Sequence, residues 1–171
     1  MGQATKNTSA AATQNFTELV KKFDTAMLIT RAGENGPLHA RPMAVAEIGE
    51  DGSIWFITGK DTAKVGELQQ DSELVATFQE ARLYVSVTGR GEVSQDRAHI
   101  QRIWKEPFRV WFDGKDDPNI VLLRLKPSTG EYWDNTGTKG LKFALKFAAA
   151  YVSGKELRDP GDPAQHAKVQ L

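Results

Sequence analysis

The sequence predicts a mainly β domain of the α+β class, a small antiparallel barrel decorated with helices. Six or seven short runs rich in β-branched and aromatic residues are separated by tight-turn signals, which is typical of strands joined as hairpins. Helical periodicity occurs in the connections between these runs. The order of elements lacks the alternation of strand and helix found in parallel sheets, so a Rossmann fold is excluded. No internal repeat or domain boundary is visible.

The first half of the chain predicts a helix followed by a three-stranded meander. Residues 1–12 are small and polar and are expected to be disordered, whereas apolar residues recur at helical spacing from Phe16 to Phe23. Turn signals at Glu34–Pro37 and Asp51–Gly52 separate three runs of high β propensity. These runs are Ala26–Ala32, Leu38–Ile48 and Ile54–Gly59.

The second half predicts further hairpins with helices between them. A helix over Thr62–Gln70 interrupts the sheet, and Asp96 is the expected N-cap of a second helix that runs to Trp104. A last helix is expected over Lys139–Val152, and residues 154–171 are expected to form a loose tail. The strands predicted in this half are Glu73–Glu80, Leu83–Ser94, Ile120–Pro127 and Glu131–Asn135.

Composition restricts the classes of function. Lys and Arg total 22 and Asp and Glu total 22, so bulk charge does not favour nucleic-acid binding. The absence of cysteine excludes disulfides and thiolate chemistry, and the three histidines lack metal-ligand spacing. No apolar run reaches the roughly 18 residues of a membrane span, and the first residues lack a secretory apolar region. We therefore expect a cytoplasmic protein without a metal, nucleic-acid or membrane partner.

The sequence gives little support for two other kinds of site, a Ser-His-Asp catalytic triad and a divalent cation site. No G-x-S-x-G motif is present, and no Ser-His-Asp triad is recognisable. Asp113, Asp116 and Asp117 have the chemistry to bind a divalent cation, but Gly114 and Pro118 flank them and favour turns and helix caps instead. Catalytic residues therefore remain unassigned by the sequence.

Two segments have the residue types of a phosphate site. Arg41 lies within a predicted strand, where a cation needs solvent or an anion, and Pro42 indicates a strand edge or a bulge. In Phe56–Lys64 a strand leads into a helix whose first turn contains Thr62 and Lys64. Helix N–H groups, a hydroxyl and an ammonium form a phosphate cradle, although a solvated lysine beside a threonine N-cap fits the same spacing.

Aromatic residues are the second unusual feature. Four Trp accompany eight Phe and three Tyr. Most large rings serve a core or an interface, because they bury much apolar area whatever their role. One or two of them have the shape to form the wall of a planar cofactor site.

Several segments, taken in order, resemble the pyridoxamine 5′-phosphate oxidase-like split-barrel flavoproteins, and more closely their bacterial general stress protein subgroup. The resemblance runs from about Phe16 to Tyr151. It implies a six-stranded antiparallel split barrel with flanking helices over residues 13–153, a homodimer, and FMN, or FAD as the alternative, at the dimer interface. The segments that carry it are AMLITR, ARPMA, WFITGKDTAK-x-x-EL, YVSVTGRGEV, W-x₆-WFDGKDDPN and EYWD.

The resemblance also implies roles for individual residues. Arg41 and Lys64 match positions that hold the flavin phosphate, and Thr62 matches a hydroxyl donor. Ala63 stands where the oxidase has a second basic residue, which predicts weaker flavin binding because a charge-assisted contact is missing. The remaining implied cofactor contacts surround the ring and the ribityl chain: Pro42, Met43, Ile57, Thr58, Tyr84 from the partner subunit, Trp111 and Trp133.

The same resemblance contains a departure that bears on activity. The oxidase has an Arg-x-His element for its substrate, whereas the corresponding stretch Asn135–Lys139 contains neither Arg nor His. We therefore expect an FMN-binding general stress protein without pyridoxamine phosphate oxidase activity. The alternative is a flavin-dependent reductase or oxidase of an unidentified small molecule with a nicotinamide or deazaflavin donor, although no dinucleotide fingerprint is visible. Haem binding is less favoured, because no histidine has an axial-ligand setting.

Overall fold

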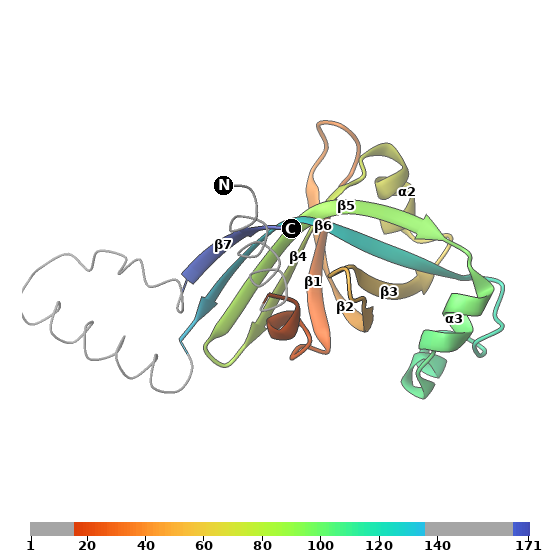
Figure 1. Ribbon diagram of the computed structural model, residues 1–171. Helices are drawn as coiled ribbons and strands as arrows, with labels where there is room; N and C mark the ends of the chain where they lie inside the picture. The colour runs from red at the N-terminus through yellow and green to blue at the C-terminus, as the bar shows by residue number, and fades with distance from the viewer. Residues whose placement is uncertain (1–15, 136–165) are drawn as a thin grey trace, which may run out of the picture.

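The computed structural model describes residues 16–135 and 166–171, drawn in colour in Figure 1. The expectations for residues 1–12 and for a helix over Lys139–Val152 lie outside the described residues. Residues 16–20 are helical, and the other helices are α2 (Ala63–Gln70), α3 (Arg97–Ile103) and the 3₁₀ helix η1 (Glu106–Val110). The strands are β1 (Thr25–Arg31), β2 (Leu38–Ile48), β3 (Ile54–Gly59), β4 (Glu73–Glu80), β5 (Leu83–Ser94), β6 (Ile120–Asp134) and β7 (His166–Gln170).

The strands β1 to β6 form a closed antiparallel barrel, which confirms the predicted fold class. Their order is β3-β2-β1-β4-β5-β6, and β3 pairs with β6 to close the ring. The closing pairs run from Ile54 opposite Leu125 to Gly59 opposite Ile120. Phe56 and Leu28 are fully buried in the barrel core because alternate strand residues point inward. In Figure 1, α2 and α3 lie on the side of the barrel away from β7.

Strand β6 corrects the prediction of two separate strands at this point. It runs unbroken through 15 residues, including Pro127. The register shifts here, because Thr88 of β5 faces Thr129 while Gly89 faces Pro127. An extra residue on β6 is thus accommodated as a bulge, which is where a strand tolerates the missing N–H of proline.

Strand β7 shows that the expectation of a loose tail is wrong for residues 166–170. It pairs with β6 from Gln170 opposite Thr129 to His166 opposite Trp133. Pairing of β3 with β6 ends at Leu125, so the same edge of β6 is open beyond that point, and β7 covers its backbone groups. Residues 154–165 lie outside the described part.

Strand β2 confirms that Pro42 lies at a local edge. Pro42 faces Met27 of β1, whereas pairing of β2 with β3 begins only at Val45. The register of that second pairing shifts between Val45 and Glu47. Pro42 therefore occupies a part of β2 that has one strand neighbour, where no ladder hydrogen bond is lost.

A second, smaller core outside the barrel is covered by α3 and η1. Ile100 and Ile103 of α3 pack with Ile57, Ile120 and other buried residues. The α3 helix has the predicted N-cap, since the Asp96 side chain accepts from the His99 N–H at 3.1 Å. Among the described residues, no helix combines the length and apolarity needed to cross a membrane.

Two glycine substitutions test the barrel geometry. A Cβ at Gly89 would lie 2.1 Å from the Lys126 carbonyl oxygen, whereas a Cβ at Gly66 in α2 would meet nothing within 4 Å. We expect Gly89→Ala to lower the free energy of unfolding by about 2–3 kcal/mol through overpacking. Gly66→Ala should raise it by about 0.5–1 kcal/mol, because alanine favours the helix. Urea unfolding followed by circular dichroism measures both, and equal effects would contradict the described register at the bulge.

Candidate functional site

A cleft of about 650 Å³ lies where β2, β3, the start of α2 and the η1 region meet. One wall is apolar, one is aromatic, and the floor carries hydroxyl and ammonium groups. The wall residues from the strands are Pro42, Met43 and Ile57, and those from the η1 region are Phe108, Trp111 and Phe112. The polar and charged lining residues are Thr58, Lys60, Asp61, Thr62, Lys64, Asp117 and Asn119. The cleft therefore combines surfaces for a flat apolar group with donors for an anion.

Seven of the ten residues implied by the resemblance line this cleft, and three do not. Arg41 is not among the lining residues, although it directly precedes Pro42 on β2 and its side chain is 21% exposed. Tyr84 and Trp133 face each other across β5 and β6 and are 41% and 36% exposed. In Figure 1, the start of β5 lies on the β7 side of the barrel, away from α2 and α3. Within one chain, these two aromatic residues therefore belong to another part of the surface.

The floor of the cleft is built by the β3–α2 junction. The Lys64 ammonium donates to Thr58 Oγ1 at 3.0 Å, and the Thr62 hydroxyl donates to the Gly59 carbonyl at 2.8 Å. Thr62 is the N-cap of α2 by position, but its side chain does not cap the helix. Burial lowers the pKa of Lys64, as does the neighbouring Arg41 cation, while Glu67 opposes both effects.

Behind the floor, a buried carboxylate that sequence reasoning missed organises the cations. Glu67 Oε2 accepts from Arg41 Nη2 at 2.9 Å and from the Thr30 hydroxyl, and Glu67 Oε1 lies 2.7 Å from His39 Nδ1. Thr30 also accepts from Arg41 Nη1. Burial by itself would raise the pKa of Glu67, but the hydrogen bonds from Thr30, His39 and Arg41 lower it to about 2.

One signal in the sequence was available for Glu67. It follows Lys64 by three residues and precedes the buried Leu68, so a helix places it beside Lys64 at the margin of the buried face. Only 7% of Glu67 is exposed, and a carboxylate is rarely buried to this extent unless it is paired. Its partners come from β1 and β2 and cannot be read from helix spacing.

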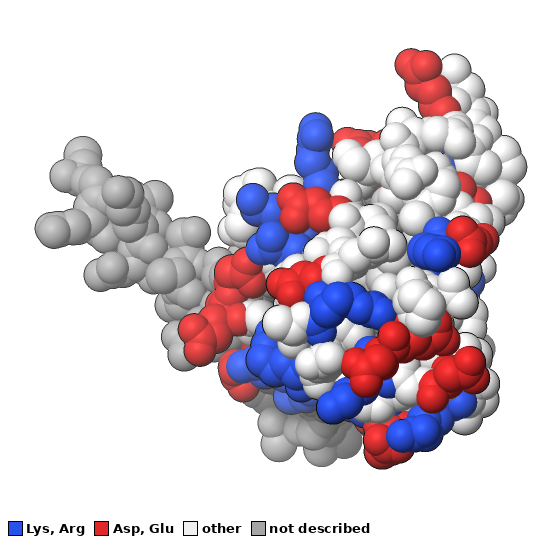
Figure 2. Space-filling view, turned by 90° about the vertical axis from the view of Figure 1, so that its right-hand side faces the viewer, with Lys and Arg blue, Asp and Glu red and all other residues white. Residues whose placement is uncertain are grey.

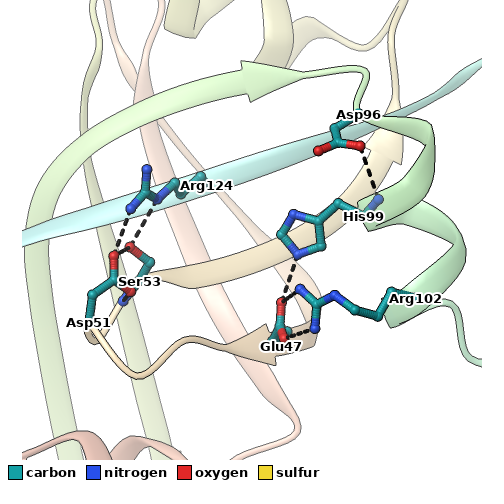
Figure 3. Close-up of polar contacts among 7 residues, drawn as sticks. All are labelled: Glu47, Asp51, Ser53, Asp96, His99, Arg102 and Arg124. Carbon is teal, nitrogen blue, oxygen red and sulfur yellow. Dashed lines mark hydrogen bonds and ion pairs between the residues drawn. The ribbon is translucent and has the colours of Figure 1, made fainter.

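The aromatic wall is held against the barrel by polar contacts of α3, shown in Figure 3. Glu47 of β2 accepts from Arg102 at 2.5 and 3.0 Å and lies 2.7 Å from His99 Nε2. The Arg102 hydrogen bond, aided by His99, lowers the pKa of Glu47 against the effect of burial. Lys105 adds a bond to the Val45 carbonyl at 3.1 Å. These contacts fix the segment that continues into η1.

A second polar group in Figure 3 joins β6 to the connection between β2 and β3. Arg124 donates to Asp51 at 2.7 Å and to Ser53 at 2.9 Å, and its guanidinium stacks over Trp55 with 5.2 Å to the ring centroid. On the face in Figure 2, Lys and Arg side chains are interspersed with Asp and Glu side chains. Charges on that face therefore lie close to partners of opposite sign.

The aspartates before β6 form turns, as predicted. Asp117 accepts from the Asn119 N–H at 2.8 Å and from the Asp113 N–H at 3.2 Å. Asp116 accepts from Gln101 at 2.7 Å. Within the described part of the chain, no group of three or more histidines and carboxylates is arranged to hold a metal ion.

The closed barrel and its cleft define the class of pyridoxamine 5′-phosphate oxidase-like split barrels. The family model described as pyridoxamine 5′-phosphate oxidase like matches residues 11–158, and the chain belongs to this family.

Within this family, the chain is similar to several general stress proteins. General stress protein 26 of Bacillus subtilis (strain 168) is 31% identical over 101 residues, which cover 55% of this chain and 69% of that protein. The general stress FMN/FAD binding protein of Xanthomonas citri is 34% identical with a TM-score of 0.62, covering 73% of this chain and 89% of that one. General stress protein 26 of Bacillus anthracis str. Sterne, at 20% identity, shares the fold with a TM-score of 0.63 over 71% of this chain and 92% of its own.

The paired state of Glu67 predicts a specific acid dependence of stability. Its folded-state pKa of about 2 lies below the ordinary 4.5, so its contribution is complete above 4.5 and is lost as pH falls toward 2. We expect Glu67→Gln to remove this part of the pH dependence, so that its free energy of unfolding falls less steeply over that range than in the wild type. Urea unfolding at a series of pH values measures both slopes, and identical slopes would show that Glu67 is not paired in the folded chain.

Proposed function

We propose that the chain is a flavin-binding general stress protein whose cleft takes FMN, with FAD as the alternative cofactor. The observation that carries the proposal is the juxtaposition of a Lys64 ammonium, backed by Arg41, with an apolar and aromatic cleft of about 650 Å³. This combination suits a flat ring joined to a phosphate. The similarity to the general stress FMN/FAD binding protein of Xanthomonas citri supports the same ligand class.

The residues present fit a flavin in their chemistry. Lys64 and the Thr58 hydroxyl offer donors to a phosphate, and Thr62 would add its hydroxyl by exchanging its bond to the Gly59 carbonyl for one to the phosphate. Arg41 is the second cation near them. The apolar strand wall and Trp111 offer surfaces to a ring system and exclude water from it. A bound flavin supplies redox chemistry, whereas the chain supplies binding, orientation and shielding.

The proposal includes a homodimer acting in the cytoplasm. Tyr84 and Trp133 lie together but away from the cleft of their own chain, so in the proposed dimer they approach the cleft of the partner. Val110 and Trp111, at 78% and 67% exposure, give the cleft an apolar rim that a second chain would cover. The cysteine-free sequence fits a reducing compartment.

Replacement of Lys64 tests the phosphate part of this proposal. We expect Lys64→Met to weaken FMN binding by about ten- to a hundred-fold, because a charge-assisted contact is lost, and to leave riboflavin binding within about twofold. Fluorescence titration with both flavins measures the two affinities. Lys126→Met, an equal change at an exposed position on β6, is the control. Equal losses for riboflavin and FMN would place Lys64 outside the phosphate contacts.

We also expect no useful oxidation of pyridoxine phosphate or pyridoxamine phosphate. A phosphorylated substrate needs its own cationic anchor to be oriented, and Asn135–Lys139 lacks the Arg-x-His element of the oxidase. Oxygen consumption and peroxide release by the flavin-loaded protein measure the reaction. Turnover near about one per second, at the low end for ordinary enzymes, would instead identify an oxidase with a different substrate anchor.

A further inference from the structure

We propose that Glu67 is a positioning residue of the anion site, whose buried carboxylate holds the Arg41 guanidinium ready for a phosphate group. The inference rests on the proposed function and adds to it a residue that never touches the ligand. It also predicts which part of the ligand senses a change at Glu67. The phosphate contact depends on this residue, and the ring contacts do not.

The contacts of Glu67 place it behind the cations rather than in front of them. Both of its oxygens are occupied, one by Arg41 and Thr30 and the other by His39. Its side chain is 8% exposed, whereas the side chains of Arg41 and His39 are 21% and 48% exposed. An anion arriving from solvent therefore meets cationic or imidazole groups before it meets the carboxylate.

Arg41 retains the capacity to bind a second anion while Glu67 holds it. A guanidinium has five N–H donors, and the hydrogen bonds to Thr30 and Glu67 use one donor on each of its terminal nitrogens. The remaining donors keep a fixed direction because two points of the guanidinium are held. A flexible arginine would lose rotamer freedom on binding, so prior fixation removes a cost from the binding step.

The carboxylate also acts on the second cation of the site, Lys64. Lys64 precedes Glu67 by three residues on α2, and its pKa is lowered by burial and, to a smaller extent, by the positive charge of Arg41. The negative charge of Glu67 acts on Lys64 in the opposite direction. Glu67 therefore supports both cations at once, one through direct contact and the other through its field.

A role through charge alone makes the opposite prediction about ligand affinity. A carboxylate near the site repels a phosphate, so a residue that acted only by its charge would weaken FMN binding. Glu67→Asp separates the effect of the carboxylate's position from the effect of its charge, because it keeps the negative charge but shortens the side chain by one methylene. The shorter carboxylate cannot reach its partners on β1 and β2 with the same geometry.

The test compares FMN and riboflavin affinities of wild type, Glu67→Asp, Glu67→Gln and Thr30→Val by fluorescence titration. We expect Glu67→Asp to weaken FMN binding by about tenfold and to leave riboflavin binding within about twofold, since Arg41 loses its anchor. Thr30→Val keeps the side-chain shape and removes the hydroxyl between Arg41 and Glu67, and a smaller loss in the same direction is expected. Glu92→Asp, the same change in an ion pair with Arg124, is the matched control.

Each outcome of this comparison has a distinct meaning. A merely structural role would reduce both affinities together and leave their ratio unchanged, which would overturn the inference. Unchanged FMN binding in Glu67→Asp, with tighter binding in Glu67→Gln, would show action through charge alone and would overturn it as well. If Glu67→Asp does not fold, the ratio of FMN affinity to riboflavin affinity in Thr30→Val tests the inference in its place. A wild type that binds neither flavin would refute the proposed function itself.

Discussion

The architecture depends on the two-sided pairing of strand β6. Its first residues pair with β3 on one side and β5 on the other, which closes the barrel. Beyond the bulge at Pro127, the edge that β3 has left is covered by β7. Because the barrel is closed, β3 pairs with β2 on one side and with β6 on the other, and these two pairings fix its register. The fixed end of β3 in turn fixes the position of the connection to α2.

The candidate site forms where this pairing is incomplete. β2 reaches past β3 at Pro42, and the cleft occupies the space beside that stretch. The α2 helix follows β3 directly and brings Lys64 and Glu67 to the same place. The opposite wall is held in place by α3 and η1, through the apolar core that contains Ile100, Ile103 and Phe108 and through the hydrogen bonds of Glu47 with Arg102 and His99. The barrel thus sets the floor of the cleft, and α3 sets its wall.

Local patterns explain how much of this was predictable. The meander, the hairpin of β4 and β5, the Asp96 cap and the edge position of Pro42 follow from periodicity and turn chemistry within a few residues. The continuous β6 and the added β7 were missed because they depend on which distant edge is open. For the same reason the sequence indicated Arg41 and Lys64 but not their shared carboxylate. Tyr84 and Trp133 were implied by resemblance alone, and one chain does not bring them to the cleft.

The charge of the proposed site shows why preorganisation matters here. Arg41, Lys60 and Lys64 contribute three positive charges and Glu67, Asp61 and Asp117 three negative charges, and Ala63 adds none where the related oxidase has a base. Balanced charges attract a distant anion weakly, and salt screens them further because the Debye length is about 8 Å at physiological ionic strength. Discrimination must therefore come from contact, through donors whose directions are fixed before the ligand arrives. Two strands, β1 and β2, and the helix α2 meet at Glu67 and fix these donors. The carboxylate that weakens the long-range attraction of an anion therefore improves the fit of its contacts at short range.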